Sequence, residues 1–339
     1  MTPRAALVEA ARRWRDDAHP ARVEACARTL DEGNRFTAEA LAFAVNQQMA
    51  LIEASSLDHW LGDSVHEPVE VGVIEAGNVP LAGLQDYLAV VGLGHGFLGA
   101  VSSRSPWLLP AFAEEVEEVG GPKARFVDHE DLPELADALI ASGTDETISH
   151  LSSVCDDLGI PALLRGNRFA VAVIDGRETE DERIGLAEDI LLHEGLGCRN
   201  VALVFAPEGL DADPYFEALS VFRGTFPAHP RTSGSLKMQQ AFLDAVGAPH
   251  AYGDGLVYLV SRGDAEVQAP GHLRWVPVPN VSETEAWIAA NAGRIQLVSA
   301  RDGLRLSAEV PRVAPGEAQR PTLDWQPDQR STVDWLRGL

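Results

Sequence analysis

The sequence has few cysteines and almost no lysine. Its 339 residues include three cysteines, Cys26, Cys155 and Cys198, and no C-x-x-C pair. This excludes a zinc cage of paired cysteines and a disulfide framework, and it fits a reduced cytoplasmic setting. Lys123 and Lys237 are the only lysines among 27 basic residues, against 51 acidic residues and a net charge of −24. Such acidity argues against nucleic acid or an anionic membrane as the main partner, and it suits a protein kept in solution at high salt.

Long apolar runs are also missing. No uninterrupted run approaches the ~20 residues of a membrane-spanning helix. The first 18 residues mix arginines with Glu9, Asp16 and Asp17 and contain no apolar core, so we expect no secretory signal. We therefore expect a cytoplasmic protein without a membrane span. The length and the 45% content of hydrophobic residues suit one large α/β unit or two domains.

The common nucleotide and hydrolase motifs are absent as well. The chain has no P-loop, no H-E-x-x-H and no G-x-S-x-G, and we predict no metal site. The run Gly92–Gly96 is not a dinucleotide fingerprint, because Phe97 stands where the last glycine belongs. It also follows an expected helix and precedes an expected strand, the reverse of the required order. We predict that this run ends a helix.

What is present is an alternation of short strands and helices after a helical start. Two apolar faces at helical spacing predict core positions near the N-terminus, namely Leu7, Ala10, Ala11 and Trp14, then Leu41, Val45, Met49 and Ile52. Beyond them, apolar runs predict strands at 69–74, 97–101, 124–127, 162–164, 170–174, 201–206, 256–260, 274–278 and 295–298. Helices are predicted at 81–91, 106–118, 132–140, 147–158, 180–192, 215–222, 235–246 and 283–291. This order favours mostly parallel sheets with helices on both faces.

The stretch from Gly195 to Asn200 is the most informative. It places Cys198 in a glycine-flanked turn directly before an expected strand, where backbone N–H groups can stabilise an oxyanion. The adjacent Arg199 favours the thiolate, which is the reactive form of cysteine. The alternative is a small buried hydrophobe at the start of a strand.

Asn78 is a second candidate, because it lies in a loop after a buried strand and before a helix. Its amide could donate a hydrogen bond to an oxyanion, whereas the alternative is an ordinary Gly-Asn turn. His193 and Glu194 precede the cysteine turn and could act as base or acid. For both, we favour an exposed helix end.

Several of these segments, taken together, resemble the aldehyde dehydrogenase superfamily. Within it, the chain is most similar to the acyl-CoA reductases related to the fatty-acid reductase of bacterial bioluminescence. The order and spacing of the segments over residues 69–325 carry the likeness. The segments are Ala76–Pro80, Ser102–Arg104, Ala141–Thr144, Arg165–Arg168 and Gly195–Asn200, with Gln319 and Pro321 near the C-terminus.

The resemblance implies an α/β fold with two three-layer domains and mostly parallel sheets. Residues 1–176 would form the N-terminal helices and the nucleotide-binding domain, onto which the tail 316–339 would pack. Residues 177–315 would form the domain of the catalytic cysteine.

The resemblance also implies a reaction, the NADPH-dependent reduction of a fatty acyl-CoA to the aldehyde through a Cys198 thioester. Asn78 and the Cys198 backbone N–H would stabilise the oxyanion. The cofactor would bind on loops after the early strands, at Ser102, Ser103, Arg104, Ser142, Gly143 and Thr144.

The chain departs from the family pattern at two places. Hydrolytic relatives have a glutamate that activates water, whereas Arg165–Phe169 contains no carboxylate, which favours a reductase. Where relatives carry a lysine for the nucleotide ribose, this chain has Ala100. We expect Arg104 to take over by binding the 2′-phosphate of NADPH, and an Ala100→Lys change to tighten nucleotide binding.

Two alternatives stay open. The same chemistry could run oxidatively, as in a CoA-acylating aldehyde dehydrogenase. The chain could instead be a non-catalytic acyl-binding subunit descended from the enzyme, which Ala100 favours and the intact Cys198 turn opposes. Apart from the acyl-CoA substrate, the partner would be a second copy of the chain or an acyl-activating protein.

Overall fold

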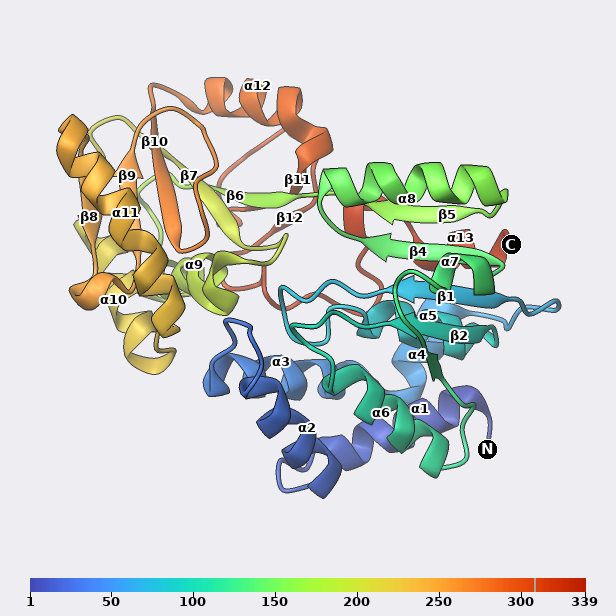
Figure 1. The fold of residues 1–339 in the computed structure, drawn as a ribbon. Helices are drawn as coiled ribbons and strands as arrows, with labels where there is room; N and C mark the ends of the chain where they lie inside the picture. Colours follow the sequence, from blue (N-terminus) through green and yellow to red (C-terminus); the bar gives the residue numbers. More distant parts are fainter. Residues whose placement is uncertain (308) are drawn as a thin grey trace. The chain divides into compact units, whose positions relative to one another are not determined.

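The computed structural model describes residues 1–307 and 309–339 (Figure 1). The chain divides into two compact units. The first unit comprises Met1–Asn34, Leu41–Asn167 and Thr322–Leu339, and the second comprises Arg35–Ala40 and Arg168–Pro321. Each unit contains its own sheet.

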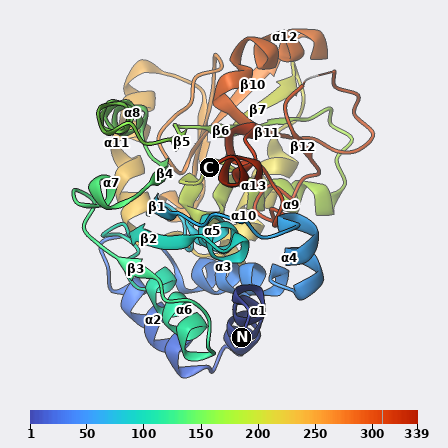
Figure 2. The same cartoon turned by 90° about the vertical axis from the view of Figure 1, so that its right-hand side faces the viewer.

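Helices dominate the N-terminal part of the chain. They are α1 (Pro3–Trp14), α2 (Pro20–Leu30), α3 (Ala38–Leu51) and α4 (Ala54–Leu61). The predicted core faces are confirmed, because Leu7, Trp14, Val45 and Met49 are fully buried, as are the other positions named for these faces to within a few per cent. Helices α1 and α6 (Leu108–Glu118) lie side by side in both views (Figures 1 and 2).

The sheet of the first unit has five parallel strands in the order β3-β2-β1-β4-β5. The strands are β1 (Glu70–Ile74), β2 (Gly96–Ala100), β3 (Arg125–Phe126), β4 (Ala138–Ser142) and β5 (Ala162–Arg165). The helices between them are α5 (Leu84–Leu93), α6, α7 (Leu132–Leu135) and α8 (Asp145–Leu158). The strand order reverses at β1, so the loops after β1 and β4 flank a topological switch point.

Helices cover both faces of this sheet, as expected for a doubly wound arrangement. Val71 and Val73 of β1 point into a core shared with α1, α5 and α6. Their neighbour Ile74 points the other way, into a core with α7 and α8. This alternation follows from the two-residue period of a strand. The Gly92–Gly96 run ends α5, because Gly94 adopts the left-handed conformation (φ 101°) at the helix C-cap.

The predicted helix over 132–140 is wrong in its second half. Helix α7 ends at Leu135, and residues 138–142 form the buried central strand β4. A strand buried on both faces is a continuous apolar run, and such a run resembles a buried helix in sequence.

The sheet of the second unit has seven strands in the order β12-β11-β6-β7-β10-β9-β8. The strands are β6 (Phe169–Val173), β7 (Val201–Pro207), β8 (His250–Tyr252), β9 (Leu259–Arg262), β10 (His272–Val278), β11 (Ile295–Ser299) and β12 (Arg312–Val313). Their pairings are parallel except that of β8 with β9.

Helices cover this second sheet too. They are α9 (Glu180–Leu191), α10 (Asp213–Thr225), α11 (Pro230–Val246) and α12 (Val281–Asn291). Ile288 of α12 packs on one face of the sheet against Val171, Leu203 and Val276. Side chains of α9 and α10 pack on the face that presents Val204 and Trp275.

The division between the units differs from the expected domain limits. The expected limit at residue 176 would leave β6 with the first sheet, but β6 pairs with β7 and β11 in the second. The lasting passage into the second unit therefore comes at Arg168, and Arg35–Ala40, also within the expected first domain, belong to the second unit as well. Likewise, only Thr322–Leu339 of the tail belongs to the first unit.

The C-terminal segment is fixed to α5. The side-chain amide of Gln85 donates to the carbonyls of Leu323 (2.7 Å) and Trp325 (2.8 Å). Helix α13 (Thr332–Arg337) packs against α5 (Figure 2). Among the described residues, no helix is long and apolar enough to cross a membrane.

Candidate active site

Cys198 lies in the turn that joins the end of α9 to β7, and its side chain is half-buried. Gly195 begins this turn in the left-handed conformation (φ 70°). A Cβ on Gly195 would also lie 3.1 Å from the backbone nitrogen of Gly271. Only glycine meets both conditions without strain, which explains the glycine before the cysteine.

The interpretation of His193 and Glu194 as an exposed helix end is wrong, because both side chains are buried. Both residues also have left-handed backbones (φ 54° and 59°), so the chain makes a sharp reversal before Gly195. Glu194 is ion-paired with Arg223 of α10 at 2.9 Å, and both side chains are about 4% exposed. Burial lowers the pKa of His193 to about 4, so its imidazole is neutral at pH 7.

Arg199 directly follows Cys198, and its side chain is hydrogen-bonded to a segment near the C-terminus. Its guanidinium donates to the carbonyls of Ala318 and Glu317. Burial lowers the pKa of Arg199 to about 10, and the negative charges of Cys198 and Asp189 oppose this shift. The guanidinium therefore stays charged at pH 7, and its attraction to Cys198 favours the thiolate.

Asp189 of α9 holds the same segment from the other side. Its carboxylate accepts the backbone N–H groups of Gly316 and Ala318, both at 2.9 Å, and the Ser299 hydroxyl at 3.0 Å. Burial raises the pKa of Asp189 to about 7 against these hydrogen bonds. The cysteine turn and residues 316–318 are thus parts of one hydrogen-bonded assembly in the second unit.

Asn78 lies where the sequence predicts, in the loop between β1 and α5 of the first unit, and it is partly exposed. The preceding Gly77 packs closely on the loop after β2, since a Cβ there would overlap Ser102 and lie 3.1 Å from the Cβ of Arg104. Asn78 belongs to the first unit and Cys198 to the second.

The proposed cofactor residues follow β2 and β4. Ser103 and Arg104 are exposed beyond β2, and Ser102 accepts the Arg104 N–H at 3.3 Å. Among the described carboxylates, none pairs with the Arg104 guanidinium, so this cation is available to an anion. The loop after β2 therefore fits a phosphate group.

The loop after β4 fits a phosphate less well. Ser142 ends the strand, Gly143 follows, and the Thr144 hydroxyl caps α8 by accepting the Thr147 N–H at 3.2 Å. Asp145 and Glu146 add two carboxylates to the first turn of α8. Their charges oppose an anion at this helix end.

The expected gain from Ala100→Lys is not supported by the geometry. Ala100 is fully buried, and its side chain packs with Ile74, Leu98 and Ala141 in the core beneath α7 and α8. A lysine there would place an ammonium among apolar side chains, which is destabilising. Position 100, where the resemblance predicts a lysine, is therefore a core alanine in this chain.

Arg165, which stands in the stretch without the hydrolytic glutamate, has a structural partner. It forms a buried ion pair with Asp86 of α5 at 2.7 and 3.0 Å, and it donates to the Thr332 hydroxyl at 2.7 Å. This bidentate pair joins β5, α5 and α13 within the first unit.

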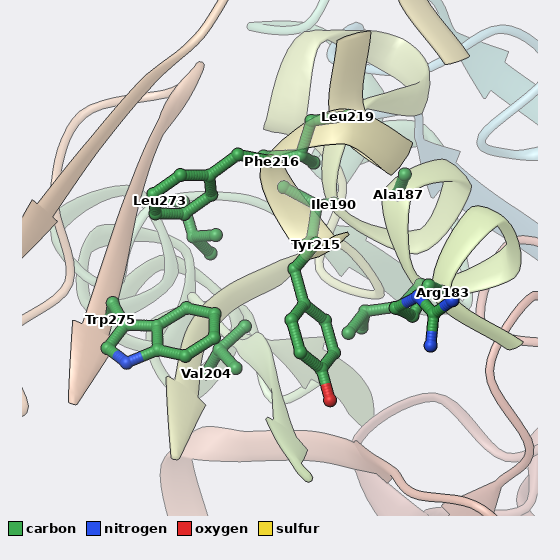
Figure 3. Close-up of a pocket in the computed structure, with 10 residues that line it drawn as sticks. Arg183, Ala187, Ile190, Val204, Tyr215, Phe216, Leu219, Leu273 and Trp275 are labelled. Carbon is green, nitrogen blue, oxygen red and sulfur yellow. The ribbon is translucent and has the colours of Figure 1, made fainter. Parts of the chain in front are cut away.

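The second unit also encloses a small apolar cavity of about 10 Å³ between α9, α10 and the sheet (Figure 3). Ile190, Tyr215 and Trp275 are among its lining residues. This volume is about that of a single water site, so the cavity as it stands does not accommodate an acyl chain.

Some residues of this site were not foreseen. Asp189 and Asn200 occupy ordinary helix and turn positions in the sequence, yet both side chains are buried beside the cysteine turn. Burial is predicted from the periodicity of apolar residues, and a single buried polar residue has no such pattern. The one signal was the position of Asn200 between the cysteine turn and the apolar run of β7.

No protein-family model matches the sequence, and no curated protein matches it. Solved structures do. A candidate aldehyde dehydrogenase from Burkholderia cenocepacia has a TM-score of 0.71 and 15% identity, covering 91% of this chain and 78% of that chain. The methylmalonate-semialdehyde dehydrogenase of Oceanimonas doudoroffii has a TM-score of 0.69 and 15% identity over 89% of this chain and 74% of that chain. An NADP-dependent enzyme of Escherichia coli has a TM-score of 0.69 and 15% identity, over 93% and 78%.

These similarities define the class of fold. The chain has the α/β fold of the aldehyde dehydrogenases, with parallel-dominated sheets, and the expected fold class is confirmed.

Proposed function

We propose that this chain reduces a fatty acyl-CoA to the corresponding aldehyde with NADPH, using Cys198 as the nucleophile. The observation that carries the proposal is the setting of Cys198. It sits half-buried in a glycine-dependent turn beside a charged arginine, in a fold shared with aldehyde dehydrogenases. Cysteines in such electropositive, accessible settings are reactive.

The chain's own residues would act in two stages. The Cys198 thiolate attacks the thioester carbonyl, and the C–S bond to coenzyme A breaks as the CoA thiolate leaves and takes up a proton. The oxyanion of the tetrahedral state would accept hydrogen bonds from the Asn78 amide and the Cys198 N–H. Reduction of the acyl group then releases the aldehyde and returns Cys198 to its thiolate.

NADPH would supply the hydride. Arg104 would hold its 2′-phosphate, with Ser102 and Ser103 on the same loop, because the Arg104 guanidinium is exposed and no described carboxylate pairs with it. Ser142, Gly143 and Thr144 would contribute backbone contacts rather than a phosphate site, since Thr144 already caps α8.

Reduction is favoured over hydrolysis by the residues around Arg165. That stretch has no carboxylate, and the Arg165 guanidinium is bound to Asp86 inside the first unit. No base for water activation is thus supplied from this position. The acyl-enzyme would persist until it is reduced, or until coenzyme A reverses the first step.

The test is NADPH oxidation by the purified full-length protein across acyl-CoAs of graded chain length. We expect turnover with at least one chain length, and none with Cys198→Ala. If no acyl-CoA supports turnover while aldehydes with CoA and NADP⁺ do, the enzyme runs oxidatively. If the protein binds acyl-CoA without either activity, it is a non-catalytic subunit and the proposal is wrong.

A further inference from the structure

Asn200 is buried directly after the cysteine turn, and its side chain is fully engaged. The residue is 3% exposed. Its Nδ2 lies 2.7 Å from the carbonyl of Leu192, 3.1 Å from that of Asp189 and 3.3 Å from that of Ile190. Asp189 and Ile190 lie in the last turn of α9 and Leu192 is its C-cap residue, and a helix leaves its last carbonyls without partners inside the helix. The Asn200 amide therefore caps α9 from outside the helix.

The other end of the same amide holds the turn. Oδ1 of Asn200 accepts the Gly197 N–H at 2.8 Å, and the Asn200 N–H donates to the Gly197 carbonyl at 3.0 Å. The Asn200 carbonyl in turn accepts the Ala170 N–H at 3.1 Å, at the start of β6. Asn200 thus connects the end of α9, the cysteine turn and β6. Cys198 lies in the chain between Gly197 and Asn200, which are hydrogen-bonded to each other.

Asparagine is required for this arrangement, because the site needs a donor and an acceptor on one short planar group. Aspartate would keep the acceptor but turn an oxygen toward three carbonyl oxygens. Alanine would leave the carbonyls of Leu192 and Ile190 and the Gly197 N–H without the Asn200 amide, and the Asp189 carbonyl with only the Gln319 amide, at a buried position where unpaired polar groups are costly.

We infer that Asn200 is the positioning residue for Cys198, fixing the turn so that the thiolate stays beside Arg199. This inference rests on the proposed function, since it assumes that Cys198 is the nucleophile. The network of Asp189 supports it, because Asp189 and Arg199 hold the same backbone segment, residues 316–318. Residues 316–318 thus fix the Arg199 guanidinium, and Asn200 fixes the cysteine turn. If the turn were loosened, the Cys198 thiolate would move away from the Arg199 guanidinium although both charges would remain.

The experiment measures the pH profile of iodoacetamide alkylation of Cys198 by peptide mapping, in full-length protein well below its melting temperature. In the wild type we expect Cys198 to react before Cys26 and Cys155, with a midpoint below the ordinary thiol value of about 8.5. In Asn200→Ala we expect the midpoint to rise by about one pH unit, a tenfold loss of thiolate preference. Asn200→Ser, which keeps a short hydroxyl, should give a smaller shift and serves if Asn200→Ala does not fold.

The matched control is Leu243→Ala on α11, which truncates a buried side chain of the same unit, in an apolar cluster that includes no residue of the cysteine turn. It should lower the melting temperature and leave the midpoint unchanged. A wild-type midpoint near 8.5, or faster alkylation of Cys155 or Cys26, would contradict the proposed nucleophile itself. A low wild-type midpoint that stays unchanged in both Asn200 variants, or that moves equally in Leu243→Ala, would overturn only the role of Asn200.

Discussion

The three cysteines differ through their surroundings. Cys26 lies on α2 and Cys155 on α8, and burial raises the pKa of both thiols, so little thiolate forms at neutral pH. Cys26 is partly exposed, as Cys198 is, and Arg22 favours its thiolate, but burial outweighs this attraction. Cys198 lies instead in a turn, where the Arg199 charge attracts its thiolate. In the sequence, two glycines and an arginine point to this turn, and Cys198 as the nucleophile stays a prediction. The sequence does not show that Asn200 bonds to both the turn and the end of α9.

Asn78 can be tested at the same scale. If its amide donates to the oxyanion, it acts in the transition state, so Asn78→Ala should lower kcat by about 10²–10³ with a modest change in KM. Steady-state kinetics with the best acyl-CoA measure this split. Asn280→Ala, which removes an asparagine that caps α12, is the matched control and should leave kcat unchanged. A kcat within a few-fold of wild type would reduce Asn78 to a turn residue.

Arg104 is expected to determine the choice of nucleotide. Because its exposed guanidinium would bind the 2′-phosphate, Arg104→Ala should weaken NADPH binding by about 1.5–3 kcal/mol, as for a hydrogen bond to a charged group, and NADH much less. Titration of both nucleotides against wild type and variant measures this, with Lys123→Ala as a control for the loss of one exposed charge in the same unit. If the variant weakened the binding of NADPH and NADH equally, Arg104 would not recognise the 2′-phosphate.

At the scale of the elements, the β1–α5 connection contains an unusual acid. Glu75 directly follows β1 and is 4% exposed. One carboxylate oxygen accepts the Gly83 N–H at 3.4 Å, and the other is buried with no hydrogen-bond partner among the described residues. Burial raises its pKa from 4.5 to about 8, against the bond from Gly83 and with help from the Asp86 charge. The folded protein therefore holds this proton at pH 7, whereas the unfolded chain releases it.

A pH dependence of stability follows from this acid. Between pH 4.5 and about 8 the folded state binds more protons at Glu75 than the unfolded state, so its contribution falls as the pH rises through that window. Glu75→Gln keeps an acceptor for Gly83 and cannot ionise. Relative to wild type, it should raise the melting temperature at pH 8.5 by about 2–4 °C for each kcal/mol recovered, and change it little at pH 4.5. Melting curves at both pH values test this, and an equal effect at both would contradict the buried-acid account.

A comparison of the elements shows which of them hydrophobic periodicity predicts correctly and which it does not. Amphipathic helices such as α1 were predicted correctly, because one face is apolar and the other is not. The central strand β4 was mistaken for a helix, since burial on both faces removes the two-residue alternation. His193 and Glu194 looked exposed because they are polar, yet a left-handed reversal carries them inside, where Glu194 finds Arg223. Both failures come from tertiary contacts that no local window contains.

For the whole molecule, the dominant property is charge. With a net charge of −24, the excess carboxylates repel one another, and the two lysines supply few flexible cations to offset this repulsion. Counter-ions screen such repulsion, so the melting temperature should rise from dilute buffer to molar KCl. Thermal unfolding across that series is the measurement. A flat or falling trend would mean that the acidity serves another purpose.

The central claim is that Cys198 carries the acyl group, and mass spectrometry of the acyl-enzyme tests it most directly. The protein is incubated with an acyl-CoA without NADPH, digested and mapped. The account predicts one acyl adduct, on Cys198, that disappears when NADPH is added and yields aldehyde, and no adduct in Cys198→Ala. An adduct on Cys26 or Cys155 with Cys198 unmodified would contradict the claim, and a Cys198 adduct that NADPH leaves intact would contradict the proposed reduction.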